Sequence, residues 1–442
     1  MPNPQKISGP WISCDGDGNY GRPEVIRQPK ASTKVEGVSR RGLLVGASMA
    51  SLAWASRGTA LAGFTVSEEK KDNVLIVIFL RGGADGMSVL VPFFEDQYYK
   101  IRPNIAITER QSIKLDDKFG LHPAFDPIKP LIEEKKLLAI HAVGSFDQTR
   151  SHFEAMSAME RGLANDGAGP ASGWLGRYLA ASARPDHTPL RAVAFGSTMP
   201  DAFRGGLNAI GLNSIADYRL NGSDAERKEL VQRLRKLCAE GDDAASEAGR
   251  STLAVLESVQ NLKMSTDLEA RGIKYPETGL GQGLKETATL MRSGIGMEVA
   301  FLNMGGWDTH VTQGSTAGWM PGLLGELGTA LGAFAKDLGP LLDKATIVVK
   351  SEFGRRAYEN GGLGTDHGRA GAMLVMGGGI KRPGVYADWP GLKPDELEGP
   401  GDLRVTTDYR SVLKEILAKR HGFNDGGEVF PSFKGATSNF LS

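Results

Sequence analysis

Six mainly apolar runs, several of them ending in glycine and charged residues, constrain the fold of this chain more than any other feature. The clearest run is Val74–Leu80, in which every residue is apolar, and it stops at Arg81-Gly-Gly-Ala-Asp-Gly86. An uninterrupted run of this length is typical of a strand buried on both faces, as in a parallel sheet. The other five runs are Leu137–Val143, Ala192–Phe195, Met297–Leu302, Thr346–Val349 and Ala372–Met376.

Helical patterns separate several of these runs. The clearest has leucine or phenylalanine at three- and four-residue spacing from Leu324 to Leu341, which indicates an amphipathic helix. Alternation of strand and helix predicts an α/β fold with a largely parallel sheet. Residues 200–285 carry helical patterns and no strong strand run, so we expect a helical insertion or lid there. Val405–Lys419 is typical of a short strand followed by a final helix.

The charge balance gives no sign of a nucleic-acid partner or an anionic membrane surface. The chain has 52 basic and 52 acidic residues, and its formal net charge is zero, whereas nucleic-acid-binding proteins usually carry a basic patch. The two cysteines are Cys14 and Cys238. Cys238 follows a stripe of apolar residues at helical spacing and is expected to be a buried small hydrophobe rather than a reactive thiol.

The first 62 residues resemble an export leader. Arg40 and Arg41 precede a small-residue apolar run that ends at Ala60-Leu-Ala62, a pattern that the twin-arginine translocase reads. The alternative is a membrane anchor, but Arg57 interrupts the run, and a charge within a spanning helix costs about 2.5–3.5 kcal/mol. We therefore expect cleavage after Ala62 and a mature domain of residues 63–442 in the periplasm or outside the cell.

Polar residues that follow the strand-like runs are candidates for a functional site, because ligands of open α/β sheets bind beyond the carboxyl ends of strands. Carboxylates and imidazoles without cysteine suit zinc, manganese, magnesium or calcium. Asp85 is equally compatible with a role in capping a turn. Asp366 and His367 are adjacent, so one of them is expected to support a ligand rather than bind the ion. The candidate metal ligands are Asp85, Asp308, His310, Glu352 and His367.

A hydroxyl-rich turn after Leu137–Val143 is a candidate for substrate chemistry. Ser151-His-Phe-Glu154 matches a capping box, so the Ser151 hydroxyl is either a helix cap or a nucleophile, and the cap is the commoner role. Thr149 is a rival hydroxyl in the same turn. The helix N-terminus would attract an anionic ester group. Thr149, Arg150 and Ser151 are therefore the candidate catalytic residues, and Arg355 and His152 the candidate substrate-binding residues.

Several motifs together resemble the DUF1501 family of exported bacterial proteins, whose function is not established. The resemblance covers nearly all of the expected mature chain. The family in turn resembles a divergent branch of the alkaline phosphatase and sulfatase superfamily, which implies a three-layer α/β/α fold with a mostly parallel central sheet. The motifs that carry the resemblance are Leu80–Gly86, Arg150–Glu154, Gly173–Arg177, Gly305–His310, Ser351–Arg355, Gly364–Gly368 and Val429–Phe433.

The superfamily resemblance also implies roles for single residues. Asp85 matches a metal-binding aspartate after the first strand, and Asp308 with His310 resembles an aspartate–histidine metal pair. Glu352 stands where an aspartate–histidine pair is usual, and His367 matches a late histidine ligand. The Cys/Ser-x-Pro-x-Arg motif of formylglycine sulfatases is missing, which argues against that chemistry.

Two functions remain open at this level. The first is an exported hydrolase of phosphate or sulfate esters that depends on zinc, manganese or calcium, with a small-molecule or glycan ester as substrate. The second is a catalytically inactive metal-binding or assembly protein on the same fold.

Overall fold

The computed structural model describes residues 73–442, apart from short gaps at 168, 184–187, 189, 207–208, 219, 221, 240–243, 261 and 263–266. The twin-arginine leader, its expected cleavage site and Cys14 lie outside the described residues, so the export prediction stays a prediction. Among the helices that the structure describes, none has both the length and the hydrophobicity needed to cross a membrane.

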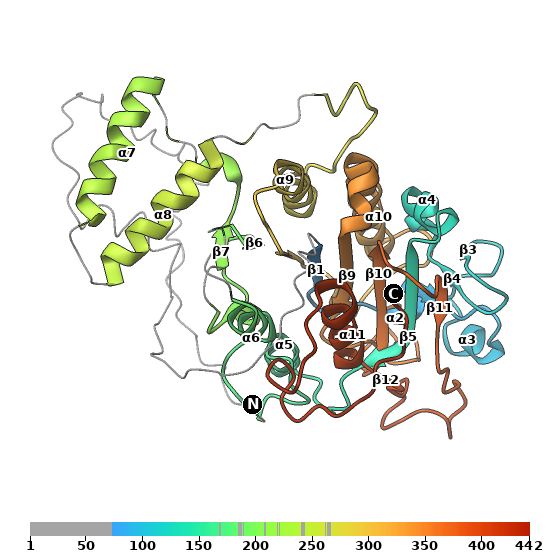
Figure 1. Cartoon of the computed structure of the whole chain (residues 1–442). Helices are drawn as coiled ribbons and strands as arrows, with labels where there is room; N and C mark the ends of the chain where they lie inside the picture. The colour runs from blue at the N-terminus through green and yellow to red at the C-terminus, as the bar shows by residue number, and fades with distance from the viewer. Residues whose placement is uncertain are drawn as a thin grey trace, which may run out of the picture. The chain divides into compact units, whose positions relative to one another are not determined.

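The centre of the fold is a nine-stranded, mostly parallel sheet (Figure 1). Its strands are β1 (Val74–Leu80), β5 (Leu137–Gly144), β6 (Ala192–Phe195), β7 (Ala209–Leu212), β8 (Val299–Met304), β9 (Ala345–Ser351), β10 (Gly371–Gly377), β11 (Gly384–Tyr386) and β12 (Thr407–Asp408). The spatial order is β11-β5-β10-β9-β1-β8-β6-β7, and β12 also pairs with β5. Within these nine strands, β10 alone runs antiparallel to its neighbours, β5 and β9.

All six predicted runs form strands of this sheet, which confirms the predicted α/β class. Each boundary lies within two residues of the prediction because most residues of these strands are apolar and buried. Within residues 200–285 no strong strand run was expected, yet β7 pairs in parallel with β6. Its four residues are too few to give a clear apolar pattern.

Helices cover both faces of the sheet. Along β1, Ile76 and Ile78 belong to one apolar core with α9 (Gly279–Ser293) and α10 (Trp319–Leu338). Val77 and Phe79 point the other way, into a second core with α5 (His152–Glu160), α6 (Trp174–Ala181) and α11 (Tyr409–His421). This alternation is the two-residue period of a strand. It produces the expected three-layer α/β/α arrangement, in which α10 and α11 lie on opposite sides of the sheet (Figure 1).

The remaining elements are smaller or peripheral. A three-stranded sheet has the order β2-β4-β3, and α7 packs against α8. Cys238 on α7 is a buried free thiol, as expected. The assignment of residues 200–285 as an inserted lid stays a prediction. The elements are α2 (Gly86–Val89), β2 (Leu90–Val91), α3 (Asp96–Ile101), β3 (Ile113–Lys114), β4 (Gly120–Leu121), η1 (Pro123–Ile128), α4 (Lys129–Glu133), η2 (Asp201–Phe203), η3 (Ile215–Tyr218), α7 (Asp224–Ala239), α8 (Ala244–Gln260) and η4 (Gly339–Lys344).

The register of the central strands brings three loops together at one edge of the sheet. Leu80, the last residue of β1, pairs with Met304 of β8 and with Ser351 of β9. The loops that follow these strands therefore start side by side. Gly82 has a φ of +121°, and a Cβ atom there would lie 2.6 Å from the Asp308 nitrogen. Only glycine permits this close approach of the loops after β1 and β8.

Candidate metal centre

Three side chains from distant parts of the chain converge at this edge of the sheet. His152 is the first residue of α5, Asp308 lies in the loop after β8, and His367 lies between β9 and β10. Each offers one ligand atom, and these atoms all lie within 4.8 Å of one another. His367 Nε2 is 2.9 Å from His152 Nε2 and 3.1 Å from Asp308 Oδ1, and His152 Nε2 is 3.4 Å from Asp308 Oδ1.

His310 joins two members of this group. Its Nε2 lies 2.9 Å from His367 Nε2 and 3.0 Å from Asp308 Oδ1. His310 is not in the compact set, that is, the three residues whose ligand atoms all lie within 4.8 Å of one another. It lies at the edge of this set, beside Asp308 and His367. Three imidazole Nε2 atoms and one carboxylate oxygen thus face each other, and we call these four residues the metal centre.

The far nitrogen of each imidazole is held by an oxygen. Nδ1 of His152 is 2.7 Å from Glu352 Oε1, and Nδ1 of His310 is 3.4 Å from Asp366 Oδ1. Nδ1 of His367 is 2.8 Å from the Arg150 carbonyl oxygen. A carbonyl oxygen only accepts hydrogen bonds, so this nitrogen carries the proton and the Nε2 lone pair of neutral His367 faces the centre. Such oxygen partners orient metal-binding histidines.

The charge state of the centre favours a bound cation. Burial opposes charge on Asp308, but the effects led by the hydrogen bond from Arg355, together with the charge of Arg355, outweigh it and lower the pKa of Asp308 to about 2. Burial lowers the pKa of His367, whereas the hydrogen bond to Glu352 raises the pKa of His152. At neutral pH the centre therefore holds an ionised carboxylate and a neutral His367, the forms that bind metals.

The distances fit a divalent ion. Ligand atoms about 2.0–2.1 Å from a tetrahedral zinc ion lie about 3.3 Å from each other. The three separations within the compact set of His152, Asp308 and His367 run from 2.9 to 3.4 Å. Several acceptor atoms this close repel each other unless a cation or a shared proton lies between them. The donor set and the held Nδ1 atoms therefore suit a metal ion.

Glu352 supports the centre from behind and is not one of the converging atoms. It is buried, and its carboxylate accepts hydrogen bonds from the Gly82 nitrogen at 2.8 Å and from the Ser351 hydroxyl at 3.0 Å, besides its contact with His152. Burial would raise the pKa of Glu352, but these bonds, led by that from His152, lower it. The structure places Glu352 behind His152, as a partner that orients its ring, and the predicted ligand role of Glu352 stays a prediction.

Asp85, the first predicted ligand, lies in a separate buried ion pair. Its two carboxylate oxygens are 2.5 and 3.0 Å from the guanidinium of Arg102, and both residues are almost fully buried. Ser88 and Gln313 donate to the same carboxylate. Asp85 also caps α2, the turn-capping alternative that the sequence left open. Asp85 is thus held in a buried ion pair and is not among the converging ligand atoms of His152, Asp308 and His367, and its predicted ligand role stays a prediction.

Arg355 lies under the centre rather than facing solvent. Its side chain is fully buried, and its guanidinium donates to the carbonyl oxygens of Gly82, Gly83, Trp307 and Thr365. Nη2 also lies 2.6 Å from Asp308 Oδ1. These bonds tie together the loops after β1, β8 and β9. These bonds hold the buried guanidinium against the three loops, and its predicted substrate contact stays a prediction.

The predicted nucleophiles occupy a helix-capping turn. The Ser151 hydroxyl accepts from the Glu154 nitrogen and caps α5. The Thr149 hydroxyl lies 2.6 Å from Glu154 Oε2 and accepts from the Ser151 nitrogen. The Arg150 guanidinium pairs with Asp402. These contacts match the capping alternative for Ser151, and the catalytic role of all three residues stays a prediction.

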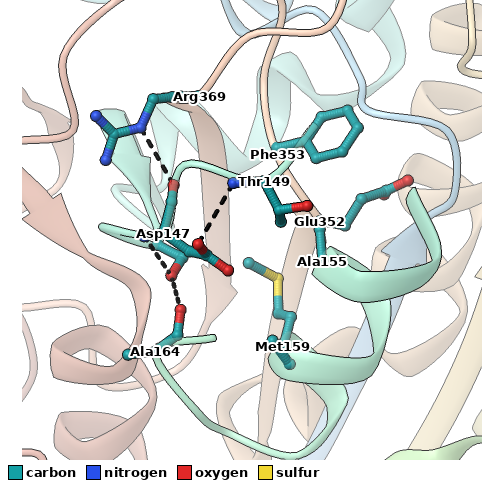
Figure 2. A pocket seen from close by; sticks show the side chains of 10 residues that line it. Asp147, Thr149, Ala155, Met159, Ala164, Glu352, Phe353 and Arg369 are labelled. Carbon is teal, nitrogen blue, oxygen red and sulfur yellow. Dashed lines mark hydrogen bonds between the residues drawn. The ribbon is translucent and has the colours of Figure 1, made fainter. Parts of the chain in front are cut away.

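A small pocket lies on the other side of this turn (Figure 2). The Asp147 side chain accepts from the Thr149 nitrogen at 3.3 Å, and its carbonyl oxygen accepts from Arg369 at 3.2 Å. Glu352 and Phe353 reach the pocket from the loop after β9, and Glu352 also contacts His152. The lining residues are Ser145, Asp147, Thr149, Ala155, Ala158, Met159, Ala164, Glu352, Phe353 and Arg369.

Sequence reasoning assigned His152 to substrate and thus missed its place among the ligand atoms. The sequence position of His152 could have revealed this role. An imidazole at the first position of a capped helix after β5 lies at the same sheet edge as the other candidate ligands. Asp366, which the sequence offered as one of two possible supporting residues, lies beside His310. The pairing of Arg102 with Asp85 carried no such signal. Both pairings are set by tertiary contacts.

Comparison with known proteins places the chain in a family. The family model described as "Protein of unknown function (DUF1501)" matches residues 72–430. The chain therefore belongs to the DUF1501 family. No curated protein matches the chain. One similar solved structure is the lipoteichoic acid synthase LtaP from Listeria monocytogenes, with 8% identity and a TM-score of 0.31 over 85% of this chain and 78% of that one. A likeness of this size carries no argument about function.

Proposed function

We propose that this member of the DUF1501 family is a metal-dependent hydrolase of phosphate or sulfate esters that works outside the cytoplasm. The observation that carries the proposal is the convergence of three imidazole Nε2 atoms on Asp308 Oδ1, with an oxygen partner behind each imidazole. The nitrogen-rich donor set favours zinc over manganese and over calcium, which prefers oxygen ligands.

His152, Asp308 and His367 would hold the ion, and His310 lies beside Asp308 and His367 at the edge of this set. A divalent ion in such a site supplies a Lewis acid for the oxygens of an ester group. Arg355 keeps the Asp308 carboxylate in place, and Glu352 keeps the His152 ring in place. The partly exposed guanidinium of Arg356, 3.3 Å from Asp366 behind His310, is the cation best situated to meet an anionic ester.

Export forms part of the same proposal. Twin-arginine export carries folded cargo, so a chain that uses it would meet the twin-arginine translocase with its sheet already assembled and its metal centre complete. The substrate would be a small-molecule or glycan ester of the periplasm or cell exterior. Sequencing the N-terminus of the exported protein tests this part, and a mature chain that starts at Gly63 is the expected result.

A second candidate function is metal-dependent binding or assembly without catalysis. It is favoured by the engagement of the Ser151 and Thr149 hydroxyls in the helix cap, because the oxygen of each hydroxyl already accepts a hydrogen bond from a backbone nitrogen. Under this alternative the protein binds its ion but turns over no ester.

Metal analysis combined with an ester panel tests both candidates. Purified wild-type protein is expected to contain one divalent ion per chain, and Asp308→Ala and His367→Ala are expected to lose it. His421→Gln, at the end of α11, is the control that keeps it. Phosphate and sulfate monoesters are then assayed with and without chelator. Chelator-sensitive turnover supports hydrolysis, bound ion without turnover supports binding, and wild type without stoichiometric ion overturns both.

A further inference from the structure

Exposed apolar side chains directly follow two members of the metal centre in the sequence. Phe153 directly follows His152 and is 84% exposed, and Val311 directly follows His310 and is 64% exposed. Single exposed apolar residues are common on protein surfaces and need no explanation. Two large exposed apolar side chains that each follow a member of a polar centre call for an explanation, because the other groups of that centre are polar or charged.

Two further residues extend this surface. The backbone of residues 311–313 is joined to that of residues 362–363 by hydrogen bonds from the Thr312 nitrogen to the Gly362 oxygen and from the Gln313 nitrogen to the Leu363 oxygen. Leu363, 45% exposed, therefore lies beside the Val311 loop. Trp319, 63% exposed, donates from Nε1 to the Gly306 carbonyl oxygen at 2.9 Å, two residues before Asp308. We call Phe153, Val311, Trp319 and Leu363 the apolar rim.

The rim and the centre have complementary chemistry. The centre combines a cation site with Arg356, whose side chain is 32% exposed, and so suits an anionic group. The rim offers apolar surface directly beside it and brings no charge of its own. A ligand that satisfies both regions has an anionic head and an apolar tail.

We propose that the substrate is an amphiphilic ester, whose phosphate or sulfate head reaches the metal centre while its apolar tail lies against the apolar rim. This inference rests on the proposed function and adds the substrate class. Burial of the tail removes apolar surface from water on both partners, and each fully buried methylene strengthens binding about fourfold. A tail partly covered by the rim is therefore expected to add at least about tenfold over seven methylenes.

Calorimetric titration of the full chain, loaded with zinc, tests the substrate class. The probes are methyl phosphate, octyl phosphate and an octyl glucoside, all used below the concentration at which octyl chains form micelles. Octyl phosphate is expected to bind at least tenfold more tightly than methyl phosphate. The double variant Phe153→Ser/Val311→Ser is expected to lose most of that difference. Met199→Ser, an exposed apolar residue beside Gly211 of β7, is the matched control and keeps it. The zinc content of each variant is measured first.

The outcomes separate this inference from the proposed function. Equal affinity for methyl and octyl phosphate, or a double variant that binds octyl phosphate as wild type does, overturns the amphiphilic substrate and leaves ester hydrolysis standing. Binding of octyl glucoside as tight as that of octyl phosphate, with no binding of methyl phosphate, overturns the anionic head and the proposed hydrolysis together, while the apolar contact remains. Failure of all three probes to bind overturns both proposals.

Discussion

Arg355 Nη2 lies 2.6 Å from Asp308 Oδ1, and this contact joins a fully buried cation to the carboxylate of the metal centre. Asp308 is about half exposed, so one end of the pair faces the solvent and the other faces the interior. The same guanidinium binds carbonyl oxygens from three loops. Arg355 therefore couples the position of the carboxylate to the packing of the sheet edge.

Loss of Arg355 is expected to destabilise the fold strongly. Arg355→Met leaves buried carbonyl oxygens of Gly82, Gly83 and Thr365 without their donor, and removal of one partner from a buried charged network costs about 3–5 kcal/mol. Urea denaturation measures the free energy of unfolding. The matched control is Arg356→Met, because Arg356 is partly exposed and its ion pair is worth at most about 1 kcal/mol. Similar losses for the two variants would contradict the assignment.

Glu352 is expected to control metal affinity without binding the ion. Glu352→Gln keeps the size of the side chain but removes the charge that holds the His152 ring, and loss of such a partner weakens metal binding about 10- to 100-fold. Competition with a chelator of known affinity measures the change. Glu396→Gln, an exposed carboxylate that bonds Lys393, is the control. An unchanged zinc affinity in Glu352→Gln would show that His152 needs no carboxylate.

Variants of Asp85 and Asp308 are expected to show that the stability of the fold and the binding of the ion depend on different carboxylates. Asp85→Asn leaves the buried Arg102 guanidinium without its counter-charge, which costs about 3–5 kcal/mol, yet the folded variant should keep a full complement of ion. Asp308→Asn should lose the ion at a smaller cost in stability. Unfolding and metal content are measured on both variants. Loss of ion from folded Asp85→Asn would restore the ligand role that the sequence suggested.

Ser151 is expected to behave as a helix cap. Ser151→Ala removes the acceptor for the Glu154 nitrogen, which costs about 1 kcal/mol, and should leave the metal content unchanged. Ser151→Asn supplies another capping side chain and should restore most of the stability. Thermal unfolding of both variants measures this. On an ester that the wild type hydrolyses, a hundredfold loss of turnover in both variants would identify Ser151 as a nucleophile instead.

Lys350 is expected to make the stability depend on pH. It is almost fully buried on β9, with its ammonium nitrogen 4.4 Å from the centre of the Phe79 ring. Burial lowers the pKa of Lys350 to about 7 from 10.5. Between these values the unfolded chain binds more protons than the folded one, so this group makes stability rise as pH increases from 7 to 10.5.

The Lys350→Met variant tests the sign of this effect. The variant is expected to be more stable than wild type at pH 7, by up to roughly 5 kcal/mol, and the difference should shrink as pH approaches 10.5. Chemical denaturation at a series of pH values measures it. Lys336→Met is the control, because Lys336 Nζ donates to the Gly272 carbonyl oxygen at the surface. A wild type that is as stable as Lys350→Met at pH 7 would refute the prediction.

Much of the fold was predictable because its signals are local. Val74–Leu80 and Thr346–Val349 are buried on both faces, so burial leaves an uninterrupted apolar run in the sequence. The short strands β7 and β11 have partly exposed residues and leave no such pattern. The sheet edge that carries the site followed from the parallel order of β1, β8 and β9.

The roles of single residues were less predictable, since residue type after a strand does not reveal a distant partner. Asp85 and Asp308 both follow strands and look equivalent in the sequence. Asp85 meets Arg102, a fully buried residue at the end of α3, whereas Asp308 meets the histidines and Arg355. The difference lies in contacts made by segments remote in the chain, which only the assembled fold supplies.

The proposed metal ion would also tie the order of assembly to its own capture. His152 and His367 are 215 positions apart in the sequence, so an ion that joins them closes a very long loop. In the folded protein the sheet has already brought the two histidines together, so the entropic cost of closing the loop does not weaken ion binding. In an unfolded chain that cost would oppose binding. Mass action then makes the ion a selective stabiliser of completed molecules. A chain truncated before β10, or nicked and separated between α5 and β8, should therefore retain no tight site.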